Sequence, residues 1–167
     1  MCLYIQIHQM NIRQLIKEER AKVAPLDVDA LLRNATEDLS LAGYTPELIG
    51  KEIYESLDEH FDDKLIIGPL YSKLSGYRFV DEVYRVHCGK HVRWIRIFTR
   101  DGKDVGAGYL TNGGIVVDVK IQNNGVYILC KSGNRFVQYR FDECLTYQKL
   151  SMNEQMILAT NDVSQKR

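Results

Sequence analysis

Apolar residues recur with a helical period through the first 63 residues of the chain. Asn11 can cap a short helix that Pro25 ends, and Asp27 starts a second helix that Gly43 closes. Thr45 followed by Pro46 is typical of a helix start. The third helix, residues 46–60, is expected to pack one apolar stripe against the rest of the protein: Leu48, Ile49, Ile53, Leu57 and Phe61.

Turn-forming residues interrupt the helical period between residues 64 and 77. Gly68-Pro69 and Ser75-Gly76 flank short apolar pieces, so we expect a loop and a domain junction here. Residues 79–86 fit either one or two helical turns or a strand, and the pattern leaves both open.

From residue 91 the pattern changes to short runs of β-branched and aromatic residues separated by Gly and Asn turns. These runs predict strands over residues 91–99, 105–110, 115–121, 126–131, 135–141 and 145–150. The four glycines between Gly106 and Gly114 fit tight turns and sheet curvature. We therefore predict an α+β protein, in which a helical acidic region (1–68) precedes a small antiparallel SH3-like β-barrel (76–150) and a tail (151–167). The tail is expected to hold one apolar turn, Met156-Ile157-Leu158, followed by polar residues that fray or reach toward a partner.

Charge divides the chain into two halves, although the net charge is zero. Residues 1–63 contain 6 Lys/Arg and 13 Asp/Glu, a balance of −7, whereas residues 64–167 contain 16 and 9, a balance of +7. Such asymmetry indicates separate partners, two parts that attract each other, or two solvated surfaces.

The sequence has no apolar run of the roughly 20 residues that a membrane-spanning helix needs. Its first residues also lack the basic and apolar regions of a signal peptide. We therefore expect an intracellular protein, in the host cytoplasm or the virion if it is viral, that is not secreted. Four scattered cysteines then read as reduced thiols.

Motifs for catalysis are missing from the sequence. It holds no phosphate-binding glycine loop, no G-x-S-x-G elbow and no H-E-x-x-H. A zinc site would have to combine ligands that are widely spaced in the sequence: His87, Cys88, His91, Cys130 and Cys144. A nucleophilic Cys88 would need His87 or His91 as its base. We expect no enzyme, no metal and no cofactor.

A basic segment with interleaved aromatic residues spans residues 85–100 and supplies the candidate residues for binding a partner or nucleic acid: Arg85, Lys90, Arg93, Trp94, Arg96 and Arg100. Cations attract phosphates and rings stack on bases, so this composition suits nucleic acid. Alternation along a strand, however, places Arg93 and Arg96 on opposite faces. A protein partner, or pairing of these arginines with the acidic half, therefore stays open.

The third predicted helix carries an acidic outer edge, with these residues as a candidate docking face for a basic partner: Glu52, Glu55, Asp58 and Glu59. The same edge is also compatible with simple solvation. We expect this edge to face basic residues, either from the Arg93–Arg100 region of this chain or from a neighbour.

Four short motifs follow one another in the second half of the chain: Gly89-Lys90-His91-Val92-Arg93-Trp94-Ile95, Gly106-Ala107-Gly108-Tyr109-Leu110, Tyr127-Ile128-Leu129 and Phe136-Val137-Gln138. Their order resembles a pattern of small β-rich proteins of large nucleocytoplasmic double-stranded DNA viruses. The chain departs from that pattern at Val92, Trp94, Ala107 and Phe136, and the helical first half lies outside it. The resemblance implies a viral protein with a role in assembly, in virion structure or in contact with viral DNA, and it carries over no catalytic residue.

We therefore expect a non-enzymatic structural or interaction protein, a minor capsid or assembly component of a large DNA virus particle. Its partners would be other proteins within a large assembly, or further copies of itself. The alternative is a nucleic-acid-binding module that uses residues 85–100.

Overall fold

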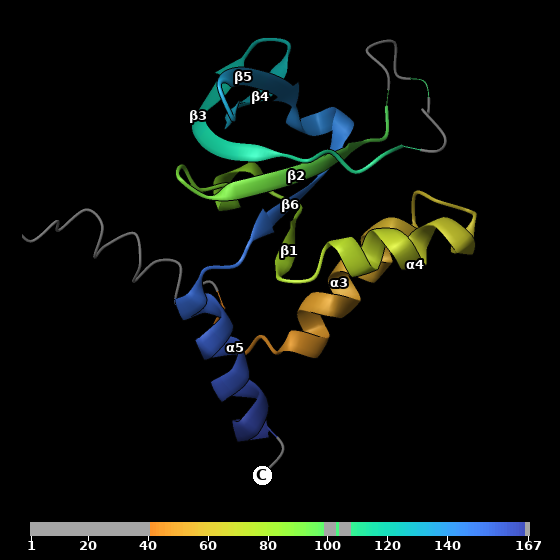
Figure 1. The fold of residues 1–167 in the computed structure, drawn as a ribbon, viewed down its shortest axis with the longest axis vertical. Coiled ribbons are helices and arrows are strands. Elements are labelled where there is room, and N and C mark those ends of the chain that lie inside the picture. The colour runs from red at the N-terminus through yellow and green to blue at the C-terminus, as the bar shows by residue number, and fades with distance from the viewer. Residues whose placement is uncertain (1–40, 99–102, 104–107, 166–167) are drawn as a thin grey trace, which may run out of the picture. The chain divides into compact units, whose positions relative to one another are not determined.

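Six antiparallel strands form one sheet in the computed structural model, which describes residues 41–98, 103 and 108–165. In sheet order the strands are β1 (Tyr77–Val80), β6 (Cys144–Lys149), β2 (His91–Arg96), β3 (Gly114–Gln122), β4 (Gly125–Ser132) and β5 (Arg135–Arg140) (Figure 1). The helices are α3 (Pro46–Asp58), α4 (Lys64–Lys73) and α5 (Met152–Gln165), with the 3₁₀ turns η1 (Val83–Arg85) and η2 (Phe141–Glu143). This confirms the α+β class.

The sheet is open, with β1 and β5 at its edges, so the expected closure into a barrel is not observed. The predicted strands from residue 115 onward agree closely with β3, β4, β5 and β6. The ambiguous residues 79–86 divide between β1 and η1. The helices predicted before residue 41 and most of the strand predicted at 105–110 lie outside the described residues; Leu110 forms an isolated bridge with Ile95.

Strand β6 separates two hydrophobic cores, because its residues alternate between the faces of the sheet. After β5, η2 carries the chain across so that β6 pairs with both β1 and β2. Leu145 and Tyr147 then point to one face, and Cys144 and Thr146 point to the other. The strands β1, β6 and β2 consequently contribute buried residues to both faces of this end of the sheet.

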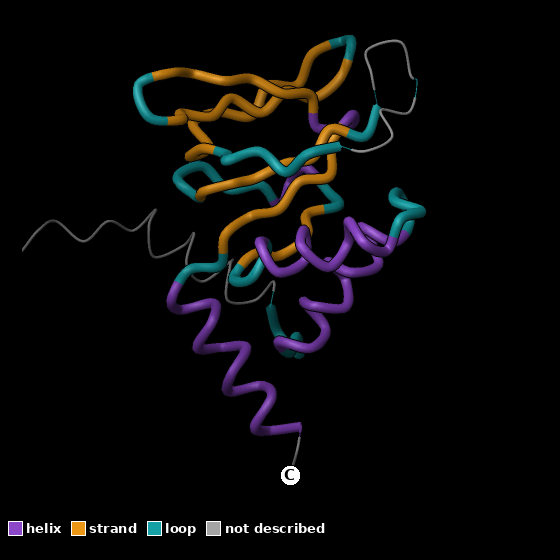
Figure 2. The backbone as a smooth tube through the Cα atoms, turned by 45° about the vertical axis from the view of Figure 1, so that its right-hand side comes forward, coloured by secondary structure: helices purple, strands orange, loops and turns teal. Residues whose placement is uncertain are grey.

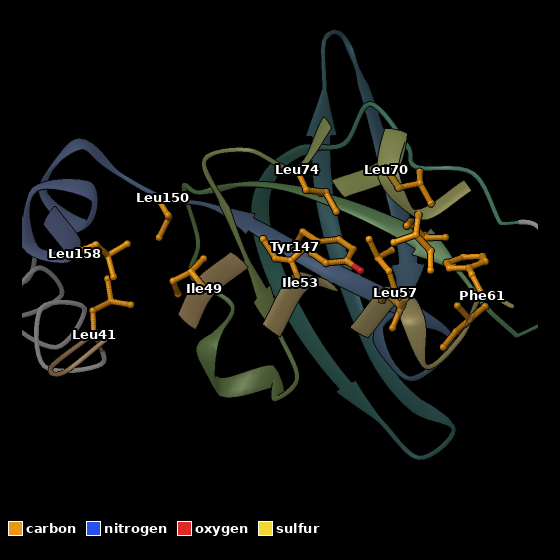
Figure 3. Packing of buried hydrophobic residues seen from close by; sticks show 14 residues of the cluster. Leu41, Ile49, Ile53, Leu57, Phe61, Leu70, Leu74, Tyr147, Leu150 and Leu158 are labelled. Atoms are coloured by element: carbon orange, nitrogen blue, oxygen red, sulfur yellow. The ribbon is translucent and has the colours of Figure 1, made fainter. Parts of the chain in front are cut away.

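The helix-side core lies between β1, β6 and β2 and the three helices, which gather at this end of the sheet (Figure 2). Tyr147 lies among Ile53, Leu57 and Leu74, and its hydroxyl is 3.0 Å from Ser56 Oγ (Figure 3). The buried members are Leu41, Ile49, Ile53, Leu57, Phe61, Ile67, Leu70, Leu74, Ile95, Ile97, Leu145, Tyr147, Leu150 and Leu158.

The sheet-side core fills the inside of the curled sheet. Trp94 on β2 stacks on Tyr139 on β5, with 4.2 Å between ring centroids and 12° between the planes. The buried members are Val80, Val86, Val92, Trp94, Val116, Ile128, Cys130, Tyr139 and Cys144. Strands at opposite ends of the β2–β5 meander therefore meet across this core.

Helix α3 begins as predicted, because Thr45 Oγ1 accepts a hydrogen bond from the Leu48 N–H at 3.3 Å. The predicted apolar stripe of α3 is buried at four of its five positions. The prediction is wrong for Leu48, which is 43% exposed. The stripe centres on Ile49 and Ile53, and a residue one position earlier is turned about 100° away from it.

The turn predicted at Gly68-Pro69 is wrong, since both residues lie within α4. The turn predicted at Ser75-Gly76 is confirmed, and Gly76 has a φ of +78° there. Asp63 caps α4 by accepting the Leu65 N–H at 2.9 Å. Pro69 removes one N–H from the helix, but the carbonyl four residues earlier belongs to Leu65, whose side chain is 85% exposed, so water can satisfy it. Burial of Ile67 and Leu70 therefore outweighs the local turn signal.

The expected frayed tail is also wrong, because residues 152–165 form α5. Ser151 and Glu154 make a capping box: the Glu154 N–H donates to Ser151 Oγ at 3.2 Å, and the Ser151 N–H donates to Glu154 Oε2 at 2.5 Å. Asn161 further along the helix donates to the carbonyls of Leu41 and Tyr44. Capping and burial of Leu158 thus hold the helix on the helix-side core.

Candidate functional site

A slot of about 590 Å³ opens between β5 and the segment 108–113, at the mouth of the curled sheet. We call it the seam slot, since it lies along β5, one of the two free edges at which the sheet stays open. Its lining residues are Trp94, Arg96, Gly108, Tyr109, Thr111, Asn112, Gly113, Ser132, Val137, Gln138 and Tyr139.

Hydrogen bonds to β2 hold the segment 108–113 on one side of the slot. The Thr111 N–H donates to the Trp94 carbonyl at 3.0 Å, and the Trp94 N–H donates to Thr111 Oγ1 at 3.1 Å. Gly113 then turns the chain toward β3 at φ +78°, where a Cβ would overlap the Val92 carbonyl oxygen. The glycine expected to serve a tight turn does so here.

Aromatic and neutral polar groups provide most of the chemistry of the seam slot. Trp94 and Tyr139 form its floor, and Tyr109 stands at its rim with 80% of its surface exposed. Burial raises the pKa of Tyr139, whose hydroxyl is 3.2 Å from Thr146 Oγ1. Asn112 and Gln138 add amide donors and acceptors.

Arg96 is the charged residue among those that line the slot. Its Nη2 lies 3.8 Å from Glu143 Oε2, while the arginine side chain stays 54% exposed. Among the described residues, no His, Cys, Asp, Glu or Lys lines the slot, and these are the side chains that commonly perform acid–base or nucleophilic chemistry. The arrangement can bind an apolar or aromatic group and a neighbouring anion.

The predicted basic residues do not form one patch. Trp94 and Arg96 meet in the seam slot, but Arg93 points to the other face, as strand alternation predicted. Its Nε donates to the Thr111 carbonyl at 2.8 Å, and its Nη1 donates to the Lys73 carbonyl at 2.9 Å. Arg93 therefore ties β2 to the end of α4 and to the slot segment.

Lys90 likewise forms an ion pair within the protein, because its Nζ lies 2.9 Å from Glu154 Oε2. Glu154 is nearly fully buried. Burial would raise the pKa of Glu154, but the Ser151 N–H and the Lys90 ammonium lower it further than burial raises it. The pair joins the turn before β2 to the start of α5.

Arg85 is the basic residue that lies beside the acidic edge of α3. It pairs with Asp81 and Glu82 at 3.3 and 3.7 Å and lies over the ring of Tyr84. A shallow hollow of about 220 Å³ is lined by Glu52, Glu55, Ser56, Glu59, Phe79, Asp81 and Arg85. The edge thus faces Arg85 rather than the expected segment Arg93–Arg100. Asp58 is exposed but is not among the lining residues, and Arg100 lies outside the described residues.

The candidate zinc and nucleophile residues are dispersed. Cys88 is exposed, whereas Cys130 and Cys144 are buried in the sheet-side core, where burial raises their pKa to about 12 and about 11. His91 Nδ1 lies 3.2 Å from the Tyr77 hydroxyl. Within the described residues, no group of three or more His, Cys, Asp or Glu side chains is placed to hold a metal ion.

Most of the seam slot was missed by sequence reasoning. Tyr139 was recognisable only as one aromatic residue in a predicted strand, and Tyr109 only as part of a glycine-rich motif. Neither position shows that it meets Trp94, because the meeting depends on the curl of the sheet. Alternation in β5 could at most have assigned Val137 and Tyr139 to a common face.

The described part of the chain holds no helix that is both long and apolar enough to cross a membrane. Comparisons with protein-family models, curated proteins and solved structures yield no match, so the interpretation of the seam slot depends on its geometry.

Proposed function

We propose that this chain is a non-enzymatic interaction protein that binds part of a partner in the seam slot. The observation that carries the proposal is the slot itself, where the Trp94–Tyr139 stack, exposed Tyr109 and Arg96 converge at an opening in the sheet. Concave sites with apolar walls and a few oriented polar groups are typical of binding sites.

The arrangement of β2 to β6 supports an SH3-like unit as the carrier of this site. The order β6-β2-β3-β4-β5, with a 3₁₀ turn before the last strand, is that of an SH3-like barrel, and β1 adds a strand beside β6. In this proposal the unit is an SH3-like barrel whose seam is kept open as a binding site.

The proposal includes a role in a large assembly, such as the particle of a large DNA virus. Its support is that residues of three of the four short motifs contribute to the proposed site. Trp94 from the first motif, Tyr109 from the second, and Val137 and Gln138 from the last all line the seam slot. A location inside a cell or virion, and self-association, are further proposals of the same kind.

Binding of single-stranded nucleic acid is the second candidate function. Tyr109 and Arg96 favour it, because an exposed ring and a cation suit base stacking and phosphate attraction. Lys90 and Arg93 weaken it, since both make close contacts inside the protein instead of extending a basic track.

Affinity isolation of the full chain from the cells that make it would test the proposal, comparing wild type with Tyr109→Ala and Arg96→Glu. We expect both changes to release the same partner while the far-UV circular dichroism stays unchanged. Tyr84→Ala is the matched control, because Tyr84 is also highly exposed but lies on η1 away from the slot. Equal recovery of every partner with all three variants would contradict the proposed site.

A further inference from the structure

We propose that the seam slot accepts an extended acidic polypeptide segment, which pairs with the free edge of β5 as an added strand. This inference rests on the proposed function and names the class of partner. The free edge, the slot beside it and the charges around it support it independently.

The first support is the backbone of β5. The two-residue turn at Gly133 and Asn134 closes on the pair Ser132↔Arg135, so alternate pairs along the β4–β5 ladder exchange hydrogen bonds. The N–H and C=O groups of Phe136 and Gln138 consequently point away from β4. No backbone hydrogen bond from described residues reaches them, because β5 ends the sheet.

The centre of the edge lacks the proline, bulge and charged side chains that protect many edge strands; its charged residues stand at the two ends, Arg135 and Arg140. Phe136 is 65% exposed and Val137 is 37% exposed at its centre, with no proline or bulge within β5. An extended polypeptide supplies donors and acceptors at the spacing of this edge, whereas a nucleic acid does not. The edge therefore favours a peptide strand.

The second support is the position of the seam slot along this same edge. Val137, Gln138 and Tyr139 are consecutive residues of β5, and all three line it. Alternate side chains of an added strand would enter the slot toward Trp94 and Tyr139, while the others would lie beside Phe136. Pairing and side-chain recognition can thus occur together.

The third support is charge. Arg96 lines the slot, Arg135 is exposed at the start of β5, and Lys131 is exposed opposite Phe136. Arg140 at the other end pairs with Asp142 and Glu143 at 3.7 and 3.1 Å. Arg96, Arg135 and Lys131 give this side a positive charge, and no carboxylate is among the described residues that line the slot, so charge complementarity favours an acidic segment. A second copy would bring the same basic edge and lacks this complementarity.

The test is fluorescence polarisation of a labelled acetyl-EVTVEVTE peptide with the full chain. Gln138→Pro removes one outward N–H without removing a ladder bond, so we expect it to weaken binding about tenfold or more. Gln138→Ala removes the same slot-lining amide but keeps that N–H, so it is expected to weaken binding clearly less than Gln138→Pro does. The same peptide N-methylated at alternate residues should bind the wild-type chain about as weakly as the unmodified peptide binds Gln138→Pro.

A second pair of variants keeps the test valid if Gln138→Pro does not fold by circular dichroism and Trp94 fluorescence. Arg135→Glu should weaken binding several-fold and Arg135→Lys should retain it, because only the charge is at issue. Equal binding of the peptide with Lys in place of Glu would overturn the acidic preference. Oligo-dT that binds and displaces the peptide, unaffected by Gln138→Pro, would assign the slot to nucleic acid instead.

Strand pairing between two copies would appear as a concentration-dependent mass in sedimentation that Gln138→Pro abolishes, and it would also overturn the inference. The proposed function fails separately. If the peptide does not bind but Tyr109→Ala and Arg96→Glu still release a cellular partner, the slot binds something other than an added strand. If both experiments are negative, the seam slot is not an interaction site.

Discussion

The two faces of the sheet at β1, β6 and β2 are covered in different ways. Helices α3, α4 and α5 cover one face, and the far strands of the same sheet curl over the other. Separate helices can each settle where their apolar stripe packs best. A curled sheet cannot do so, because hydrogen bonds hold neighbouring strands about 4.8 Å apart. Both arrangements nevertheless leave a hollow. One of about 640 Å³ lies among the helices, lined in part by Ile49, Tyr71 and Leu158, and the seam slot of about 590 Å³ opens at the mouth of the curled sheet, beside the free edge of β5.

Both faces nevertheless use the same device to orient a buried tyrosine. On the helix side the Tyr147 hydroxyl meets Ser56 Oγ at 3.0 Å, and on the sheet side the Tyr139 hydroxyl meets Thr146 Oγ1 at 3.2 Å. Burial raises the pKa of both phenols, so both stay neutral. Thr146 and Tyr147 are neighbours on β6, which couples the two cores through one strand.

The largest expected effect comes from removing a fully buried side chain on either face. Leu57→Ala on the helix side and Ile128→Ala on the sheet side should each lower the free energy of unfolding by about 2–5 kcal/mol. Because β2 and β6 belong to both cores, urea unfolding followed by helical circular dichroism and by Trp94 fluorescence should give coincident transitions. Loss of the helical signal in Leu57→Ala well before the Trp94 signal would show two independent faces.

Lys90→Ala should have the next largest effect, because it leaves the buried Glu154 carboxylate without its ammonium partner. At neutral pH we expect a loss of about 1–3 kcal/mol in the free energy of unfolding. Since the folded-state pKa of Glu154 lies below its usual 4.5, its contribution is complete above that value and is lost as pH falls through the folded pKa.

The difference between wild type and Lys90→Ala should therefore shrink in acid, which urea titrations across the acidic range can measure. Lys120→Ala is the control, because Lys120 is an exposed residue of β3. A difference that grows with acidification would contradict the role of Glu154 as the ionised partner.

Removing either buried tyrosine hydroxyl should lower the free energy of unfolding by a smaller amount, which is expected to be similar on the two faces. Tyr147→Phe and Tyr139→Phe each remove one buried hydrogen bond and should each cost about 0.5–1.5 kcal/mol of unfolding free energy. Tyr84→Phe, at an exposed ring, should change nothing measurable. If Tyr139→Phe cost nothing while Tyr147→Phe cost the full amount, the sheet-side hydroxyl would be free to serve a ligand instead.

The acidic edge of α3 should give the smallest change in stability. Glu55 pairs with Lys51 at 3.6 Å, and both side chains are well exposed, so Glu55→Lys should change the free energy of unfolding by less than about 0.5 kcal/mol. Any partner bound there should instead show altered salt dependence, with Glu55→Gln as the control. A loss above about 1 kcal/mol in thermal or urea unfolding would make the edge a structural feature.

Local pattern determined much of the strand arrangement. Alternation and Gly or Asn turns located β3, β4 and β5 within one or two residues, and Thr45 located the start of α3. The opposite orientations of Arg93 and Arg96 also followed from the period of a strand. These features depend on neighbours in sequence, because backbone geometry fixes the period and turn residues fix its interruptions.

Only the tertiary structure decided α4, α5 and the seam slot. Burial of Ile67 overrode the signal at Gly68-Pro69, and docking of Leu158 and Asn161 ordered a segment with little periodicity. Placement of β6 between β1 and β2, and the stack of Trp94 on Tyr139, depend on residues far apart in sequence. Local periodicity carries no information on which distant strands meet, since that choice belongs to the packing of the whole sheet.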